Sequence, residues 1–241
     1  MIIVHHLNNS RSQRILWLLE ELRLPYEIKP YQRNAQTRLA PPELKAVHPL
    51  GKSPVISDDG RVIAESGAII DYIIRRHGGG RLQPDPSSAA YDDYVQWLHF
   101  AEGSAALPFQ LKLYVSALAA AAAPLAARIE SEIANHLGYI DGRLAGRSYL
   151  LGDELSGADI QLSYVGEVAG VRANRAAYPH LTPGSGAIRR VRPTRPQSRA
   201  AAPTVSRRRR YRTQALSFAR RGGAGMIVPM RPAIARSRRR T

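Results

Sequence analysis

The stretch that decides the fold is residues 2–22, which read IIVHHLNNSRSQRILWLLEEL. It begins with β-branched side chains that predict a short strand over residues 2–6. The two asparagines and the serine that follow form a turn, and Ser10 with Gln13 three residues later matches a helix capping box. Over residues 11–22 the isoleucine and leucines recur at helical spacing. A strand that turns directly into an amphipathic helix is typical of the opening of an α/β layer.

The next sixty residues continue the alternation of strand and helix. The patterns predict a strand over 25–30, a short helix from Pro41, a hairpin over 54–64, and a helix over 67–77 that Ser66 caps and glycines end. The resulting order of strand, helix, strand, helix, hairpin and helix predicts a small α/β layer of about eighty residues.

Only helical patterns follow the linker at residues 84–87. We predict one long helix over 88–118, a second over 124–144, and a third that Ser156 and Asp159 open as cap and third residue. The side chains of the long helix that are available for a core are Trp97, Leu98, Leu107, Leu111 and Leu118. The fold class is therefore an α/β N-terminal domain followed by an all-α C-terminal domain.

The charge of the chain is divided unevenly. Its formal net charge of +16 includes 17 arginines in residues 183–241, which hold no lysine and no acid. Residues 1–182 carry 18 basic and 19 acidic side chains. We predict that residues 183–241 form a disordered, arginine-rich tail. Our hypothesis is that a shifted reading frame produced it, and the alternative is a basic arm that binds polyanions non-specifically.

The 241-residue chain contains no cysteine, so any thiol chemistry must use a thiol that a ligand brings in. The N-terminus shows no signal-peptide pattern. The alanine-rich stretch 117–127 is the longest apolar run, and Pro124 interrupts it, so we expect no membrane span. These features favour the cytoplasm. The histidines show no metal-ligand spacing with acids, so no metal is expected.

Four motifs resemble one known family in the same order. They are residues 5–22 (HHLNNSRSQRILWLLEEL), 42–55 (PELKAVHPLGKSPV), 64–67 (AESG) and 155–159 (LSGAD). Together they are similar to the cytosolic glutathione transferases, in the serine-type bacterial and fungal branch. The resemblance covers residues 1–182. It implies a thioredoxin-like glutathione-binding domain over 1–82, an all-helical domain over 87–182, and a homodimer.

The resemblance also implies how glutathione is held, as a co-substrate with no further cofactor. Glu65 would pair with its ammonium, and Ser66, at a helix N-terminus, would hold the neighbouring carboxylate. Lys52 would reach the glycyl carboxylate. The Ser53–Pro54 bond would be cis and turn the preceding backbone toward the peptide. Each residue also has a plainer interpretation, as a cap, a surface charge or an ordinary strand start.

Ser10 is the residue that the resemblance assigns to catalysis. A free thiol has a pKa of roughly 8.5, and lowering it by two units needs about 2.7 kcal/mol. One charge-assisted hydrogen bond of roughly 1.5–3 kcal/mol, with a helix-dipole contribution, could supply that. Ser10 would stabilise the thiolate, which then attacks a small electrophile. Arg11 and Ser12 lie close enough to share or replace this role, and Ser10 could instead be only a helix cap.

Two functional alternatives stay open: glutathione-dependent peroxide reduction at the same site, and a non-catalytic binding module. Ser156 and Asp159 are expected to be structural. Tyr114 and Trp97 could line an electrophile pocket or pack in the core. After Thr182 the pattern of the family's covering helix is lost. We therefore expect an incomplete helical domain with apolar faces exposed on the helices at 88–118 and 156–170.

Overall fold

A mixed four-stranded sheet forms the centre of the N-terminal region in the computed structural model, which describes residues 1–173 and 175–181. The strands are β1 (Ile2–Leu7), β2 (Tyr26–Tyr31), β3 (Val55–Asp58) and β4 (Arg61–Ala64), in the order β2-β1-β3-β4. β2 runs parallel to β1, whereas β3 runs antiparallel to both β1 and β4. Val4 lies opposite Ile28 on one side and Ile56 on the other.

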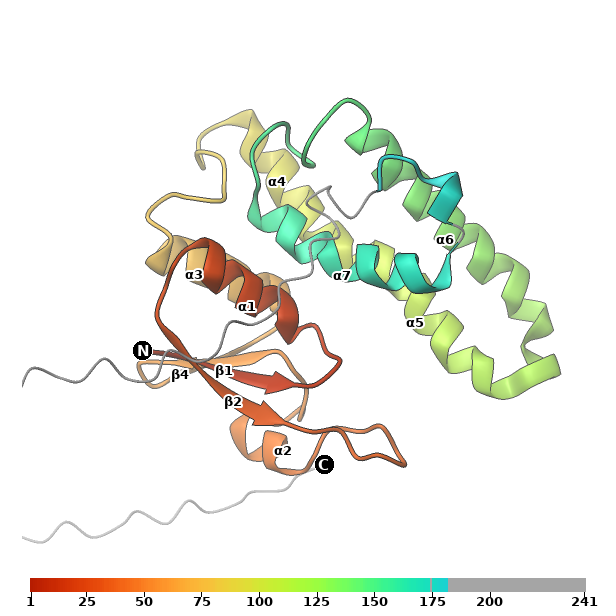
Figure 1. Cartoon of the computed structure of the whole chain (residues 1–241), viewed down its shortest axis with the longest axis horizontal. Helices are drawn as coiled ribbons and strands as arrows, with labels where there is room; N and C mark the ends of the chain where they lie inside the picture. The colour runs from red at the N-terminus through yellow and green to blue at the C-terminus, as the bar shows by residue number, and fades with distance from the viewer. Residues whose placement is uncertain (174, 182–241) are drawn as a thin grey trace, which may run out of the picture. The chain divides into compact units, whose positions relative to one another are not determined.

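Helices cover both faces of this sheet (Figure 1). α1 (Ser12–Glu21) and α3 (Ser66–His77) lie side by side on one face, and the short α2 (Glu43–Val47) lies on the other. The parallel β1–α1–β2 unit followed by the β3–β4 hairpin and α3 is the thioredoxin-like arrangement. The predicted α/β fold class is confirmed.

The helical region begins with a nearly continuous run of three segments, α4 (Ala89–Phe100), the π-helical turn η1 (Ala101–Ala105) and α5 (Ala106–Val115). The 3₁₀ segment η2 (Ser116–Ala122) contains a kink at Ala119, where φ is 48°, and leads into α6 (Ala123–Leu144). α7 (Gly157–Arg172) and the 3₁₀ turn η3 (Arg175–Ala177) complete the described part. The predicted helix over 88–118 therefore exists, but π-helical and 3₁₀ turns interrupt it.

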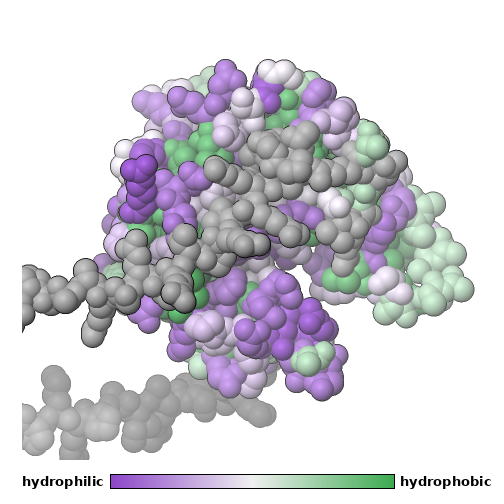
Figure 2. All heavy atoms as spheres, in the orientation of Figure 1, coloured by the Kyte–Doolittle hydropathy of each residue, from purple (hydrophilic) through white to green (hydrophobic). Residues whose placement is uncertain are grey.

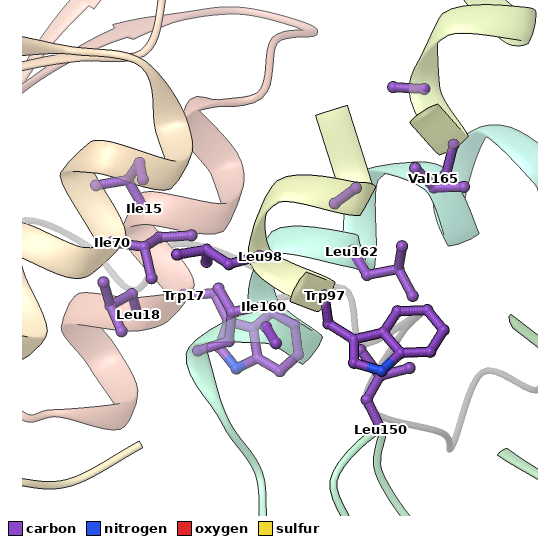
Figure 3. Packing of buried hydrophobic residues seen from close by; sticks show 14 of the residues in the cluster. Ile15, Trp17, Leu18, Ile70, Trp97, Leu98, Leu150, Ile160, Leu162 and Val165 are labelled. Carbon is purple, nitrogen blue, oxygen red and sulfur yellow. The ribbon is translucent and has the colours of Figure 1, made fainter. Parts of the chain in front are cut away.

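Most buried hydrophobic side chains of both regions form one core, and a second small cluster of Leu7, Tyr31 and Leu44 lies apart from it. Leu98 of α4 and Ile160 of α7 meet Ile15 and Ile70 of the N-terminal helices (Figure 3). Trp97 is 1% exposed and stacks on Tyr139 of α6, which makes it a core residue. The helical region thus packs against α1 and α3, on the side of these helices that faces away from the sheet.

Part of the predicted helical core is wrong. Leu107, Leu111 and Leu118 are 52%, 42% and 54% exposed, because α5 and η2 extend beyond the helices that could cover them. Figure 2 shows this end of the α5–α6 hairpin as a pale green, mildly apolar surface. The expected exposure is therefore present on α5. Over residues 157–170 of α7 it is absent: Ile160, Leu162 and Val165 are buried and Val168 is partly buried, because α1, α3 and α4 pack around this helix.

The continuous helical run Ala89–Leu144 passes the length and composition test for a membrane span. An 18-residue window in it has a mean hydropathy of 1.3 and is 22% buried. The prediction that no apolar run approaches membrane-spanning length is therefore wrong on that test, because α5, η2 and α6 follow one another as one alanine- and leucine-rich helical run with few charged residues. The kink at Ala119 divides the run. The predicted arginine-rich tail, residues 183–241, lies outside the described residues.

Candidate functional site

The end of β1, the start of β3 and the turn that carries Ser10 meet at one end of the sheet. β1 ends at Leu7, and the pairing of His5 with Val55 brings the start of β3 beside it. The peptide bond before β3, Ser53–Pro54, is cis, as the resemblance implied. The Ser53 hydroxyl donates to the His5 carbonyl (2.9 Å) and accepts from the Leu7 amide (3.3 Å). The start of β3 is therefore fastened to the end of β1.

Ser10 lies at this junction. Its Oγ is 3.3 Å from Ser53 Oγ, so the structure brings these two predicted site residues together. The side chain is buried, with 9% exposure, and its hydroxyl donates to the Leu7 carbonyl at 2.7 Å. The predicted capping box with Gln13 is wrong: α1 begins at Ser12 with Arg11 at the N-cap position and no side-chain cap. Ser10 is hydrogen-bonded back to its own strand instead.

The two alternatives to Ser10 occupy different environments. Ser12 is fully buried, and its Oγ lies 2.8 Å from both Ser10 Oγ and His6 Nδ1. Arg11 is 26% exposed at its side chain, pairs with Glu102 of η1 at 2.9 Å, and stacks over the Tyr164 ring. Neither side chain shares the position of Ser10 next to Ser53.

Ser66 and Glu65 mark the start of α3. Ser66 is the first helical residue and is buried, so the prediction that it caps the helix is wrong. Glu65 takes the N-cap position without a side-chain bond, at φ 68° and ψ 116°. This backbone conformation is sparsely populated for any residue other than glycine, and such strain is typical of functional sites. The Glu65 side chain is exposed beside it.

Arg14 is a site residue that we did not predict. Its guanidinium is 1% exposed, and Nη1 contacts Glu102 (2.7 Å), Gln161 (2.8 Å) and Ser66 Oγ (3.2 Å). Its Nε and Nη2 have no hydrogen-bond partner among the described residues. Burial lowers the pKa of Arg14 to about 10, against the opposing effect of Glu102, so it stays charged at neutral pH.

A signal for Arg14 was present in the sequence. Arg14 is four residues before Leu18 and eight before Leu22, so it falls on the apolar stripe of its helix. A charge on such a stripe is buried with it, and buried charges need partners. The partners themselves, Glu102 and Gln161, come from distant segments that no local pattern connects to residue 14.

Lys52 and Glu65 are both exposed. Neither forms an ion pair within residues 1–173 and 175–181. Lys52 directly precedes Ser53, and Glu65 directly precedes Ser66, so both charges border the same end of the sheet. An amine and a carboxylate at this spacing can hold the opposite charges of a small zwitterionic ligand.

A separate cavity of about 350 Å³ opens between η1, α5 and α6. Its lining includes Gly103, Leu107, Leu111, Arg128 and His136, and none of the predicted glutathione-site residues. Neither of the aromatic residues that we considered for an electrophile pocket lines it, since Trp97 packs in the core and Tyr114 is 65% exposed.

Comparisons with known proteins agree with this geometry. A family model described as "Glutathione S-transferase, N-terminal domain" matches residues 10–76. "Glutathione S-transferase 3" of Schizosaccharomyces pombe is 37% identical over 178 residues, covering 68% of this chain and 72% of the relative. "Glutathione S-transferase 1" of Saccharomyces cerevisiae is 34% identical over 185 residues, covering 68% and 79%.

Solved structures show the same likeness. A glutathione S-transferase of Actinobacillus pleuropneumoniae superposes with a TM-score of 0.71 at 35% identity, covering 76% of this chain and 85% of that one. A sphingomonad glutathione S-transferase, solved in complex with glutathione, gives a TM-score of 0.63 at 26% identity, covering 76% and 90%. The two fungal relatives, the family model and the shared fold together show that this chain belongs to the glutathione S-transferase family.

Proposed function

We propose that this protein binds glutathione as its co-substrate and transfers the glutathione sulfur to small electrophiles, with Ser10 stabilising the thiolate. The observation that carries the proposal is the position of Ser10, 3.3 Å from Ser53 and beside the cis Ser53–Pro54 bond. No further cofactor is required by this chemistry. The sphingomonad relative, which holds glutathione, supports the choice of ligand.

The charges around the site match those of glutathione. Glu65 is proposed to pair with the ammonium, and Lys52 with the glycyl carboxylate. The γ-glutamyl carboxylate would lie at the N-terminus of α3, where Ser66 and the unpaired backbone amides favour an anion. Arg14 contacts Ser66 at 3.2 Å, and its buried Nε and Nη2 have no partner among the described residues, so we propose that the same carboxylate reaches them when the groups that cover Arg14 move apart on binding.

Ser10 would act by donating one hydrogen bond to the sulfur. The thiol proton leaves to solvent, and the sulfur lone pair forms the new bond to the electrophilic carbon. The leaving group departs with the electron pair of the bond that breaks. Because the Ser10 hydroxyl donates to the Leu7 carbonyl here, it must exchange that acceptor for the sulfur when glutathione binds. A charge-assisted bond is stronger than a neutral one, so the exchange favours the thiolate.

The same observation favours a second candidate, a non-catalytic glutathione-binding module. Ser10 is 9% exposed and already hydrogen-bonded to Leu7, so it could hold the strand end and never contact the sulfur. Peroxide reduction would use the same thiolate with a different acceptor. We also propose a homodimer and a cytoplasmic location.

An ultraviolet pH titration of bound glutathione tests the proposal, using the full chain, a chain that ends at Thr182, and Ser10→Ala. We expect the thiolate band well below the free-thiol value of roughly 8.5, and a shift toward that value in Ser10→Ala. Glutathione that binds but titrates like free thiol would instead establish the binding module. Failure of every folded variant to bind glutathione would refute the proposed function. Activity assays with chloronitroarenes and with organic hydroperoxides then separate transfer from peroxide reduction.

A further inference from the structure

A line of hydrogen bonds extends into the protein behind Ser10. Ser10 Oγ lies 2.8 Å from Ser12 Oγ, and Ser12 Oγ lies 2.8 Å from His6 Nδ1. His6 belongs to β1, Ser10 lies in the turn that follows it, and Ser12 is the first residue of α1. We call this line the His6–Ser12–Ser10 chain. Ser12 is fully buried and His6 is half-buried, so the part behind Ser10 is largely shielded from solvent.

The number of available protons decides which residue donates in each hydrogen bond of the His6–Ser12–Ser10 chain. Ser10 has one hydroxyl proton, which it donates to the Leu7 carbonyl at 2.7 Å, an oxygen that can only accept. The 2.8 Å contact with Ser12 therefore requires Ser12 to donate to Ser10. The single proton of Ser12 is then used, so His6 Nδ1 must carry a proton and donate to Ser12. The consistent arrangement has His6 donating to Ser12, Ser12 to Ser10, and Ser10 to Leu7.

We propose that Ser12 and His6 are positioning residues for Ser10: their aligned hydrogen bonds occupy its acceptor side and direct its proton outward, toward the Leu7 carbonyl or the glutathione sulfur. This inference rests on the proposed function of Ser10. Hydrogen bonds in series polarise one another, by perhaps 10–30% per bond. A hydroxyl that accepts from Ser12 is therefore a stronger donor to the thiolate.

The surroundings of the His6–Ser12–Ser10 chain argue against direct contact of Ser12 with the sulfur and against Ser53 as the donor to Ser10. Ser12 has no exposed surface through which to contact the sulfur itself, so it can act only through Ser10. Ser53 is the other hydroxyl near Ser10, but its own proton goes to the His5 carbonyl. Burial lowers the pKa of His6, so at neutral pH it is an uncharged imidazole that can supply Nδ1–H as one of its tautomers.

The test is the pKa of glutathione's thiol when bound to variants of the full chain. Ser12→Ala removes the hydroxyl that donates to Ser10 and leaves the weaker backbone donor, the Ser12 amide at 3.3 Å, in place. His6→Leu removes the donor to Ser12. His6→Asn restores an amide N–H at the position of Nδ1. Two matched controls are Ser163→Ala, another buried serine that donates to a backbone carbonyl, and His5→Leu, the neighbouring histidine, which bonds to Tyr31 and Ser57.

We expect Ser12→Ala to raise the bound thiol pKa by about 10–30% of the rise caused by Ser10→Ala, with glutathione affinity unchanged at a pH low enough to keep the bound thiol protonated. His6→Leu should give a smaller rise that His6→Asn reverses, and the controls should give none. In the double variant with Ser10→Ala, Ser12→Ala should have no further effect, since its influence passes through Ser10. Thermal unfolding checks that each variant is folded.

Other results would contradict either the positioning role of Ser12 and His6 or the proposed role of Ser10. If Ser10→Ala raises the thiol pKa and Ser12→Ala does not, the positioning inference fails and the proposed function stands. If Ser12→Ala raises it equally with and without the Ser10 hydroxyl, Ser12 acts independently and the chain is refuted. If Ser10→Ala itself has no effect, the proposed role of Ser10 fails, and the positioning role fails with it.

Discussion

Replacing Arg14 with methionine should weaken glutathione binding without destabilising the empty protein. The guanidinium of Arg14 is 1% exposed, and only Nη1 has partners within the described part of the chain. Nε and Nη2 carry three N–H groups between them. A buried donor without a partner costs about 1–3 kcal/mol. Arg14 is therefore held at an energetic cost that a bound carboxylate would relieve.

The effect of Arg14→Met on the free energy is expected to differ between the empty protein and the glutathione complex. In the empty protein, methionine removes the buried charge and its unpaired donors, which offsets the lost bonds to Glu102, Gln161 and Ser66. Removing one partner of a fully buried ion pair costs about 3–5 kcal/mol because it leaves an uncompensated charge, but Glu102 is 30% exposed and keeps its ion pair with Arg11, so we expect a much smaller change here. In the complex, a charge-assisted hydrogen bond of about 1.5–3 kcal/mol to the carboxylate is lost. That corresponds to glutathione binding that is roughly 10- to 150-fold weaker.

Calorimetric titration with glutathione and thermal unfolding of the empty protein measure both effects. Arg11→Met is the matched control, because Arg11 pairs with the same Glu102 but is partly exposed and forms no hydrogen bond with Ser66 in the part of the chain that the structure describes. We expect its affinity to change much less. A variant Arg14→Met that is clearly less stable when empty, yet binds glutathione as tightly as the parent chain, would show that Arg14 is a structural residue and refute the reasoning.

Two further predictions concern stability. Asp159→Ala should destabilise the protein by about 2–5 kcal/mol, because its carboxylate accepts two buried backbone amides and the capping hydroxyl that starts α7, and each orphaned donor costs about 1–3 kcal/mol. Urea unfolding followed by tryptophan fluorescence measures it, the exposed Asp153→Ala is the control, and equal stabilities would contradict it. Although burial alone would raise the pKa of Asp58, hydrogen bonds from His77 and a tyrosine hold it below its ordinary value. Its contribution is therefore present above that ordinary value and is lost as pH falls through the folded pKa. Asp58→Asn should lose less stability than the parent chain between about pH 5 and pH 1, and equal acid sensitivity would count against this.

Local sequence was sufficient to predict most elements. β-branched runs, leucine spacing and the proline–glycine punctuation identified the four strands and α1, α2, α3, α6 and α7. Such patterns report which face of an element is apolar, and that is fixed by residues a few positions apart. The capping box of Ser156 and Asp159 was predictable for the same reason, because both partners lie within one helical turn.

Features that depend on distant partners were missed or wrong. The Ser10–Gln13 box matched the local pattern, but the Ser10 hydroxyl bonds to the end of β1 instead. Leu111 and Leu118 had the spacing of core residues, but the tertiary structure leaves them 42% and 54% exposed. A hydrogen bond or a covered face needs a partner, and the position of that partner is set by the packing of the whole region.

The sequence by itself determined the family-like order of elements and the residue types at the site: the serine after the first strand, the lysine before Ser53, and the Glu65–Ser66 pair. Tertiary structure alone decided how they act together. It placed Ser10 against Ser53, aligned Ser12 and His6 behind it, and joined Arg14 to Ser66, Glu102 and Gln161. Periodicity encodes which residues are buried, but only the packed chain decides which buried groups face each other.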